Sequence, residues 1–324
     1  MTGLPADSDL TICFAHVAYR LGERFTARGA GIRFVEARDR EALEAAIPGA
    51  DIVVVSGLWR NELLAKAPKL RFIQSISAGV DQYDKDALRA AGVRLASAQG
   101  SNERAVAEHA VSLILAMTRQ LHLARDNQRK GHWRGMIGDL SRREDELGGK
   151  TLVIVGLGRI GQRLATLAKA FDMRVIGAKR DVSTGRGAAD EVVADDRLLD
   201  VLPSADFVAL TCPLTPRTER IIDARALGAM KRSAFLINVA RGKCVDEPAL
   251  VAALNVGQIA GAGLDCTVEE PLPASSPLWA MDNVLVTPHS AGETRKYEDN
   301  VLDLLMENLA RLRRGEADLR NQIV

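Results

Sequence analysis

The chain has 324 residues, of which 47% are hydrophobic and 26% charged, an ordinary globular composition long enough for two domains. Its 43 Lys and Arg residues almost balance 42 Asp and Glu residues, and aromatic residues make up only 4%. With a formal net charge of +1, the chain has no overall field that attracts nucleic acid or membranes. It also has few rings on which single-stranded bases could stack.

The cysteines and the first residues of the chain indicate the cellular compartment in which the protein is expected. The sequence contains four cysteines, Cys13, Cys212, Cys244 and Cys266. None forms a CxxC pair, which favours a reducing compartment over a disulfide framework. Residues 1–9 are polar and lack the apolar core of a signal peptide. The apolar run near 111–117 is much shorter than the ~20 residues that span a bilayer. We therefore expect a soluble, cytoplasmic protein.

Short β-branched runs alternate with amphipathic stretches in the N-terminal part of the chain. The predicted strands cover residues 10–14, 51–55, 71–76 and 93–95. Helical composition is found between them, at residues 41–47, 61–67 and 84–90. This alternation predicts a mostly parallel sheet with helices on both faces.

A long helix is expected next. Ser101 is its candidate N-cap, and residues 104 to about 124 place apolar side chains at three- and four-residue spacing. The segment 126–150 that follows is polar and irregular, with Trp133 and Met136 among its few apolar residues. Two interpretations stay open for residues 120–150: a solvated crossover, or an arm that buries these side chains against a second subunit of a homodimer.

A second series of alternating strands and helices begins at Lys150. Its predicted strands cover residues 151–155, 173–176, 206–210, 234–239, 259–264 and 284–286. A last helix, roughly residues 293–314, comes too late to belong to this series. We expect that helix to return to the first domain and make it discontinuous.

A glycine-rich motif joins the first strand of the second series to its first helix. The motif is Gly156-Leu157-Gly158-Arg159-Ile160-Gly161. Gly156 allows the tight turn, Gly158 lets the backbone approach a pyrophosphate, and Gly161 lets the helix pack closely on the strand. The free amides near Arg159 and Ile160 then point at the phosphates. The alternative is a glycine-rich turn without a ligand, but the strand and helix on either side favour a dinucleotide site.

These elements together predict an α/β fold with two Rossmann-like or flavodoxin-like parallel-sheet domains. The dinucleotide-binding domain, residues 103–293, is inserted into a discontinuous domain. The latter comprises residues 1–102 and 294–324 and is the expected substrate-binding domain.

The end of the second cofactor strand bears on the choice between NAD and NADP. An acidic residue at this place accepts hydrogen bonds from the adenosine ribose of NAD. This sequence has Lys179 and Arg180 instead, with Ser183 and Thr184 close behind. Two cations suit a 2′-phosphate, so we expect NADP to be preferred, with NAD still possible. The alternative interpretation is a solvated basic turn.

Three later strands each lead to a chemically useful residue: Arg241, Glu270 and His289. Ligands of open α/β sheets bind at the carboxyl ends of strands, so these side chains can converge. A hydride moving to a 2-keto acid leaves a carbonyl oxygen that needs a proton, which His289 can donate. Glu270 beside it would raise the imidazole pKa, and Arg241 would hold the substrate carboxylate and polarise the carbonyl.

Motifs spread over nearly the whole chain resemble those of the D-isomer-specific 2-hydroxyacid dehydrogenases, a family that includes glyoxylate and hydroxypyruvate reductases. They are Ser77-Ala78-Gly79-Val80-Asp81, Ala105-Val106-Ala107-Glu108-His109, the glycine motif, Cys212-Pro213-Leu214-Thr215, Asn238-Val239-Ala240-Arg241-Gly242, Gly263-Leu264-Asp265 and Thr287-Pro288-His289. The resemblance implies that Arg241, Glu270 and His289 are the catalytic residues and that the product is the D-isomer. The departure is Lys179, which stands where the family has an acidic residue.

The resemblance also implies binding residues. The backbone at Ala78 and Gly79 would contact the substrate carboxylate, in addition to Arg241 and His289. Asp265 would bind the cofactor carboxamide. The further cofactor contacts that it implies are Val106, Cys212, Pro213, Thr218, Val239, Ala240 and Gly292.

Several other residues have simpler interpretations. Glu269 is expected to be a solvated neighbour of Glu270, and His109 to be packed at the domain junction rather than catalytic. Leu58 and Trp59 either line the substrate pocket or pack in the core. Cys244 and Cys266 are expected to be small buried fillers. His16, His122 and His132 share no ligand spacing, so no metal site is expected.

The sequence therefore predicts an NAD(P)H-dependent reductase of a small 2-keto acid, glyoxylate or hydroxypyruvate first. The alternative is a nucleotide-sensing binding protein on the same fold, like the family's transcriptional corepressors, which keep a similar catalytic set. The chain ends at Val324, soon after the last predicted helix, and this lack of a long tail favours the enzyme.

Overall fold

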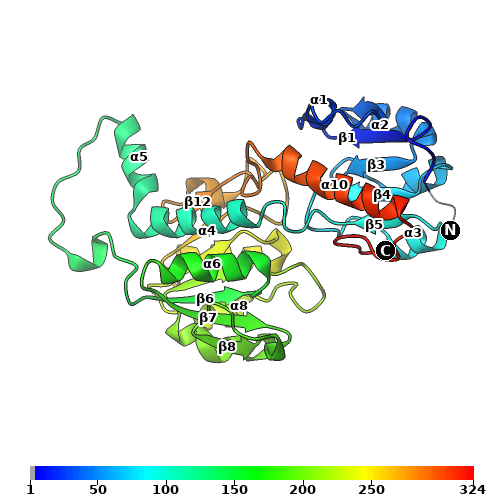
Figure 1. Cartoon of the computed structure of the whole chain (residues 1–324). Helices are drawn as coiled ribbons and strands as arrows, with labels where there is room; N and C mark the ends of the chain where they lie inside the picture. The colour runs from blue at the N-terminus through cyan, green and yellow to red at the C-terminus, as the bar shows by residue number, and fades with distance from the viewer. Residues whose placement is uncertain (1–3) are drawn as a thin grey trace. The chain divides into compact units, whose positions relative to one another are not determined.

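The computed structural model describes residues 4–324, which form two compact units. Unit 1 comprises the residues up to Asn102 together with Glu293–Val324, and unit 2 comprises Glu103–Gly292. Each unit is built on one parallel sheet with helices on both faces (Figure 1). The predicted fold class, two parallel-sheet α/β domains, is confirmed. Within the described residues, no helix combines the length and the apolar character needed to cross a bilayer.

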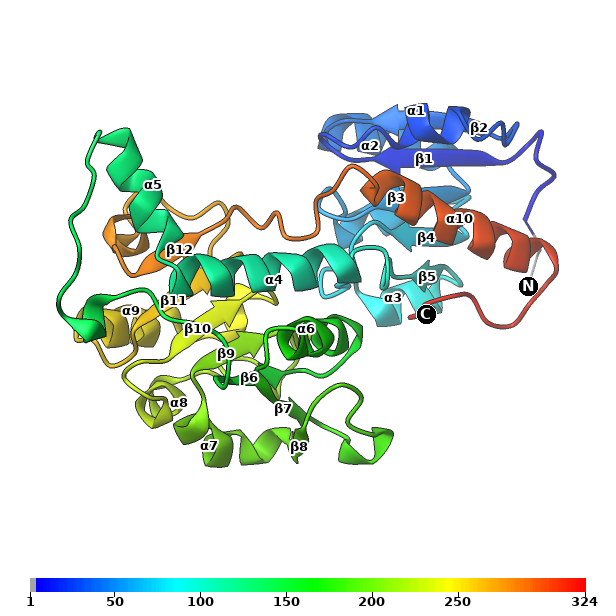
Figure 2. The same cartoon turned by 60° about the vertical axis from the view of Figure 1, so that its left-hand side comes forward.

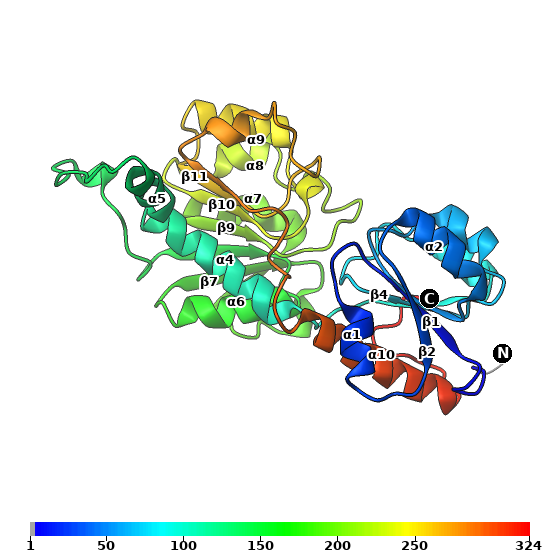
Figure 3. The same ribbon diagram turned by 90° about the horizontal axis from the view of Figure 1, so that it is seen from above.

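The sheet of unit 1 has five strands in the order β2-β1-β3-β4-β5. They are β1 (Thr11–Ala15), β2 (Arg33–Ala37), β3 (Ile52–Val55), β4 (Phe72–Ser75) and β5 (Arg94–Ala96), all parallel. Helices α1 (Leu21–Thr26) and α10 (Tyr297–Arg313) cover one face, and α2 (Arg40–Ala46) and α3 (Lys85–Ala90) cover the other (Figure 3). Successive side chains of β1 and β3 point to opposite faces of the sheet. They therefore pack alternately in two apolar clusters, one on each face.

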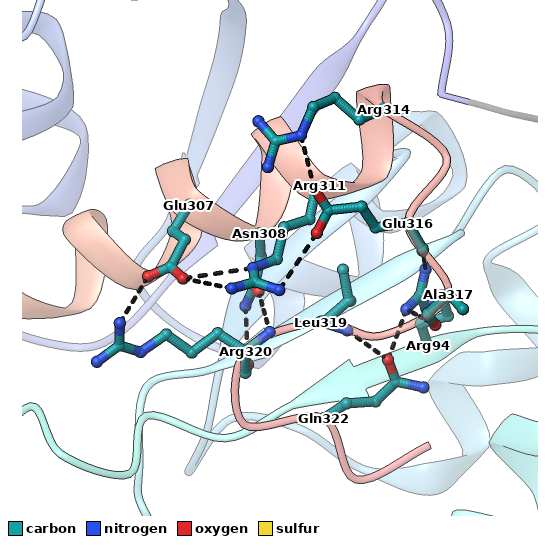
Figure 4. A network of polar contacts seen from close by, with 10 residues as sticks. All are labelled: Arg94, Glu307, Asn308, Arg311, Arg314, Glu316, Ala317, Leu319, Arg320 and Gln322. Atoms are coloured by element: carbon teal, nitrogen blue, oxygen red, sulfur yellow. Dashed lines mark hydrogen bonds and ion pairs between the residues drawn. The ribbon is translucent and has the colours of Figure 1, made fainter.

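Polar contacts hold the C-terminal segment beside α10 and β5 (Figure 4). The amide nitrogen of Asn308, fully buried on α10, donates to Gln74 at 3.0 Å, and its oxygen accepts from the backbone amide of Arg320 at 2.7 Å. Glu307 pairs with both Arg311 and Arg320. The segment then pairs with β5 through an isolated antiparallel bridge from Gln322 to Ala96, which covers the edge of the sheet.

The sheet of unit 2 has seven parallel strands in the order β12-β11-β10-β9-β6-β7-β8. They are β6 (Thr151–Val155), β7 (Arg174–Lys179), β8 (Glu191–Ala194), β9 (Phe207–Leu210), β10 (Phe235–Asn238), β11 (Gly261–Leu264) and β12 (Val284–Val286). The chain runs outward from β6 to β8 and then returns to β9 on the other side of β6. This reversal between β6 and β9 is a topological switch point, where ligands of open α/β sheets bind.

Helices cover both faces of this sheet (Figure 2). On one face lie α4 (Glu103–Thr118) and α6 (Arg159–Lys169), and on the other α7 (Leu198–Val201), α8 (Ala224–Ala229) and α9 (Glu247–Asn255). Two apolar clusters, one on each face, completely bury central strands such as β6 and β9, which explains why the sequences of these strands are continuous apolar runs.

The long helix predicted for residues 104 to about 124 is instead two helices. The first, α4, ends at Thr118, and α5 (Leu121–Arg129) begins after Gln120, whose backbone is left-handed with φ 50°. The second extends four residues into the segment predicted as irregular, to Arg129. The expected N-cap at Ser101 is wrong, because α4 begins two residues later, at Glu103; the Ser101 hydroxyl instead donates to the carbonyl of Ala98 at 2.7 Å.

Residues 120–146 form an arm that extends from the sheet of unit 2 (Figure 1). Trp133 is 96% exposed and Met136 is fully exposed. The arm is held in shape by its own contacts, including a bond from the Arg143 guanidinium to the Ile137 carbonyl at 2.8 Å. It encloses a groove of about 980 Å³, lined mostly by α5 and by the chain from Gly131 to Ile137. The solvated crossover and the docking arm are both compatible with this shape.

Candidate active site

The turn after β6 lies directly against the end of the neighbouring strand β9. Gly156 has φ +97°, and a Cβ there would lie 2.6 Å from the backbone nitrogen and Cα of Cys212. A side chain at Gly156 is therefore excluded by both its conformation and its neighbour. The turn is thus held at the switch point of the sheet.

The N-terminus of α6 leaves room for a phosphate. Gly158 is its N-cap residue; among residues 4–324 no side chain caps the helix, and no atom lies within 4 Å of a Cβ built on Gly158. Gly161, by contrast, would bring a Cβ to 2.3 Å from the carbonyl oxygen of Gly156. An anion placed next to Gly158 would meet the amides of the first turn, at Arg159 and Ile160, where the helix dipole favours negative charge. This arrangement fits a dinucleotide pyrophosphate.

The two cations at the end of β7 differ in their surroundings. The Lys179 ammonium donates to the hydroxyl of Thr184 at 2.7 Å and also to the carbonyl of Gly185. Arg180 is exposed and forms no ion pair with any residue from 4 to 324. Asp181 turns its carboxylate to the hydroxyl and amide of Ser183, which lower the pKa of Asp181. Arg180 is therefore the cation that remains available to a ligand phosphate.

His289 and Glu270 form a hydrogen-bonded pair. The Nδ1 atom of His289 lies 2.8 Å from Oε2 of Glu270, whose Oε1 accepts from the backbone amide of Thr267 at 3.1 Å. The hydrogen bond to Glu270 raises the pKa of His289 above its usual value, although burial opposes it. Burial alone would raise the pKa of Glu270, but the hydrogen bond and charge of His289 prevail and lower it. Both groups therefore favour their charged forms.

Arg241 follows β10 in a turn that is held by hydrogen bonds from the side chain of Asn238. The Asn238 side chain accepts from the amide of Ala240 at 3.0 Å and donates to the carbonyl of Arg241 at 3.0 Å. A Cβ on Gly242 would lie 2.0 Å from the backbone of Thr267, so the loops after β10 and β11 touch here. The positive charge of Arg241 acts on both His289 and Glu270 and lowers the pKa of each. The structure thus brings the three predicted catalytic residues together.

Asp265, at the end of β11, is 2% exposed. Its Oδ1 atom accepts from the hydroxyl of Thr287 at 2.7 Å and from the amides of Ser290 and Ala291 at 2.9 and 3.2 Å. The Nε2 atom of His109 lies 3.4 Å from the same oxygen. This carboxylate therefore organises the chain on both sides of His289.

The remaining predicted site residues are distributed over both units. In unit 2, Val106 lies on the buried face of α4, Cys212 and Pro213 follow β9, and Val239 and Ala240 follow β10. Thr218 donates its hydroxyl to the Pro213 carbonyl at 2.6 Å, and Gly292 is the last residue of the unit. Ala78 and Gly79 follow β4 in unit 1.

The structure decides between some of the simpler interpretations. Trp59 is a core residue, 1% exposed and packed near Tyr83, so it does not line a pocket. Leu58 is partly buried against the same cluster. Cys244 and Cys266 are buried, as expected for small fillers, and Glu269 is exposed, as expected for a solvated carboxylate.

The sequence interpretation assigned no role to Thr287 or Asn238, and took His109 for a packing residue. Both are polar residues at the end of a predicted strand. Thr287 lies two residues before His289, and Asn238 lies three residues before Arg241. The hydrogen-bond partners of these residues could not be predicted from the sequence, because each contact depends on how neighbouring strands and loops are placed.

A seven-stranded sheet with an open phosphate-binding turn and a His–Glu pair at its carboxyl edge defines a class, the dinucleotide-binding α/β proteins. Residues 111–291 match the family model described as D-isomer specific 2-hydroxyacid dehydrogenase, NAD binding domain. The chain belongs to the D-isomer-specific 2-hydroxyacid dehydrogenase family, as its motifs predicted.

Individual relatives agree with this assignment. The chain is 36% identical over 290 residues to a glyoxylate reductase of Pyrococcus furiosus, covering 86% of this chain and 83% of the relative. It is 39% identical over 272 residues to a D-3-phosphoglycerate dehydrogenase of Mycobacterium bovis, covering 83% of this chain. The chain spans only about 50% of that relative's length. A crystal structure of a D-isomer specific 2-hydroxyacid dehydrogenase family protein from Aeromonas salmonicida superposes with a TM-score of 0.86 at 31% identity, covering 98% and 99% of the two chains.

The His289–Glu270 pair leads to a prediction about pH. If His289 donates the proton, reduction requires the imidazolium, which is present below the pKa of His289 and is lost as the pH rises through it. Replacing Glu270 by glutamine removes the main cause of the raised pKa. The alkaline limb of kcat/KM for reduction should therefore shift to lower pH. Replacing the exposed neighbour Glu269 by glutamine is the matched control and should leave the limb in place. An unchanged limb in the Glu270 variant would contradict the pairing.

Proposed function

We propose that this protein reduces a small 2-keto acid, such as glyoxylate or hydroxypyruvate, to the D-2-hydroxy acid with NAD(P)H. The observation that carries the proposal is the hydrogen-bonded His289–Glu270 pair beside Arg241, in the same unit as the open phosphate-binding turn. Proton donation, charge neutralisation and carboxylate binding are the three tasks of such a reduction. The P. furiosus relative is named a glyoxylate reductase, which supports glyoxylate as the first substrate to test.

Each residue has a separate task in this proposal. A nicotinamide held at the glycine turn would supply a hydride for the carbonyl carbon. His289 gives its proton to the carbonyl oxygen as negative charge develops there, and becomes neutral imidazole. Glu270 stabilises the imidazolium before the transfer and holds the ring through Nδ1, so that Nε2 carries the transferred proton. Arg241 binds the substrate carboxylate with its planar guanidinium and polarises the carbonyl.

Asp265 is the proposed partner of the cofactor carboxamide. Oδ1 accepts from the Thr287 hydroxyl and the Ser290 amide, and it shares the amide hydrogen of Ala291 with Oδ2. Within residues 4–324, that shared hydrogen, at 3.1 Å, is the only one that Oδ2 accepts. Oδ2 therefore retains a lone pair for a carboxamide N–H. For Ala78 and Gly79, the proposed backbone contact to the substrate carboxylate rests on the sequence resemblance alone.

We propose NADP as the preferred cofactor, because Arg180 is exposed at the end of β7 and forms no ion pair within residues 4–324. Replacing Arg180 by alanine should lower kcat/KM for NADPH about 10-fold and leave that for NADH unchanged, since a hydrogen bond to a charged group contributes ~1.5–3 kcal/mol. Replacing Arg174, at the opposite end of β7, by alanine is the control. Wild-type protein that uses NADH as well as or better than NADPH would contradict the preference.

We also propose that the arm, residues 120–146, docks on a second copy of the chain. Its exposed Trp133 and Met136 provide an apolar surface, and a two-fold dimer would let each arm cover its partner. Light scattering of wild-type protein should give twice 35.0 kDa, and replacing both residues by serine should give 35.0 kDa. A serine at Val256, an equally apolar and 70% exposed residue outside the arm, should leave the dimer intact. A monomeric wild type would exclude this role.

A nucleotide-sensing binding protein, the corepressor-like alternative, would keep the cofactor site without turnover. No feature of the described residues favours it over the enzyme. The four free, buried cysteines support a reducing compartment, so we propose the cytoplasm as the location.

A further inference from the structure

A short chain of hydrogen bonds joins α4 to the chain segment that carries His289. The Nε2 atom of His109, on α4, lies 2.9 Å from the hydroxyl oxygen of Thr287. That hydroxyl lies 2.7 Å from Oδ1 of Asp265. The imidazole is only partly buried, with its side chain 23% exposed, whereas Asp265 is almost completely enclosed.

The directions of these hydrogen bonds are fixed by counting hydrogens. The Thr287 hydroxyl has one hydrogen, and Asp265 as a carboxylate can only accept, so Thr287 donates to Asp265. The hydroxyl oxygen must then accept from His109, which requires a hydrogen on Nε2. A lone pair on Nε2 would instead face the carboxylate oxygen at 3.4 Å. His109 is therefore protonated at Nε2.

The same carboxylate fixes the turn that holds His289. Asp265 accepts from Thr287 before His289 and from the amides of Ser290 and Ala291 after it. Between these contacts the backbone of His289 is left-handed, with φ 53°, a conformation uncommon for residues other than glycine. The His289 amide also donates to the Thr287 carbonyl at 2.9 Å. The placement of the proton donor therefore depends on how Asp265 is held.

We propose that His109 is a positioning residue for the reduction: through Thr287 it fixes Asp265, and thereby the turn that presents His289 to the substrate. The side chain acts as a hydrogen-bond donor and takes no part in proton transfer to the substrate. This proposal rests on the proposed function for its kinetic consequence, but the hydrogen-bond chain itself is open to a test without turnover.

The first experiment is a long-range nitrogen–proton NMR spectrum of the histidine side chains in the full-length protein. The chain has five histidines, so single His→Gln variants assign the signals. The expected result is that the His109 ring carries its hydrogen on Nε2. A His109 signal protonated only at Nδ1 would overturn the proposal, whether or not the protein is an active reductase.

The second experiment measures kcat and KM in variants that remove or keep the donor. Replacing His109 by leucine removes it, and we expect kcat to fall about 10–100-fold, the range that a small misplacement of a reacting group produces. Glutamine places an amide N–H near the position of Nε2, so that variant should stay within about 3-fold of wild type. Alanine at Ser112, an exposed residue one turn further along α4, is the matched control.

A variant pair at Thr287 tests whether the two residues act through one chain. Valine removes the hydroxyl and should lower kcat as the His109→Leu change does, whereas serine should preserve it. Combining His109→Leu with Thr287→Val should lower kcat no further than Thr287→Val alone, because both changes break the same connection. Thermal unfolding of each variant separates this effect from loss of folding.

Each outcome decides the proposal. Non-additive losses of kcat that glutamine and serine rescue, with melting temperatures close to that of wild type, would support it. Additive losses, a His109→Leu variant with normal kcat, or a His109→Gln variant as slow as His109→Leu would overturn it. If wild-type protein reduces no 2-keto acid, the proposed function fails, and the NMR spectrum still decides the hydrogen-bond chain.

Discussion

Replacing His289 by glutamine is expected to lower kcat for 2-keto acid reduction by about 10²–10⁴-fold, the usual contribution of a positioned general acid. Glutamine can still bond to Glu270, but it cannot deliver a proton to the carbonyl oxygen as hydride arrives. The measurement is steady-state oxidation of NADPH at saturating glyoxylate. The dissociation constant for NADPH, followed by its fluorescence, should change little because the phosphate-binding turn is untouched.

A control isolates the effect of position from that of residue type. His132 is exposed on the arm, and its replacement by glutamine should leave kcat within about 3-fold of wild type. A His289→Gln enzyme that retained normal kcat would show that another group donates the proton. Loss of NADPH binding in the same variant would instead show that His289 serves the cofactor site.

Replacing Arg241 by alanine is expected to lower kcat/KM by about 10²–10³-fold, similar to the loss of a group that stabilises a developing oxyanion. Both the carboxylate of the substrate and the polarised carbonyl lose their partner, so KM should rise while kcat falls. Lysine at this position restores the charge but not the two-pronged geometry, and should recover only part of the loss.

The Arg241 variants are compared under one set of conditions with an Arg225→Ala control, which removes an exposed guanidinium from α8. The measurement is the full dependence of rate on glyoxylate concentration, so that KM and kcat are separated. An Arg241→Ala enzyme with unchanged kcat/KM would refute the assignment of Arg241 as the substrate clamp.

The central strands of both sheets could be predicted from the sequence, because strands buried on both faces are continuous apolar runs. The predicted run 151–155 corresponds to β6, and 206–210 contains β9. Of the four edge strands, β5 and β12 were predicted, whereas β2 and β8 were missed. β2 has the sequence Arg33-Phe34-Val35-Glu36-Ala37, which is mostly exposed and lacks the apolar run of a central strand. β8 is similarly half-exposed.

The break between α4 and α5 could not be predicted for a different reason. Apolar spacing continues through Leu121, so periodicity alone favours one helix. The left-handed backbone at Gln120 interrupts it, and nothing in the residue type signals this, since glutamine has no special preference for that conformation. Helix ends of this kind are set by tertiary contacts.

At the candidate site, residue type and chain position were sufficient for the catalytic set but not for its support. Arg241, Glu270 and His289 each follow a strand of one parallel sheet, and the carboxyl ends of such strands share an edge. The chain from His109 through Thr287 to Asp265 involves α4, β12 and β11, which are distant in the sequence. Its existence depends on packing distances that a sequence does not contain.

The most direct test of the proposed reductase function is turnover by the wild-type protein with a panel of 2-keto acids, each offered with NADPH and with NADH. We expect oxidation of the nicotinamide with glyoxylate or hydroxypyruvate, faster with NADPH, and a product of D configuration where the carbon is chiral. Binding of both nucleotides without oxidation by any acid of the panel would contradict the proposed function and favour a nucleotide-sensing role.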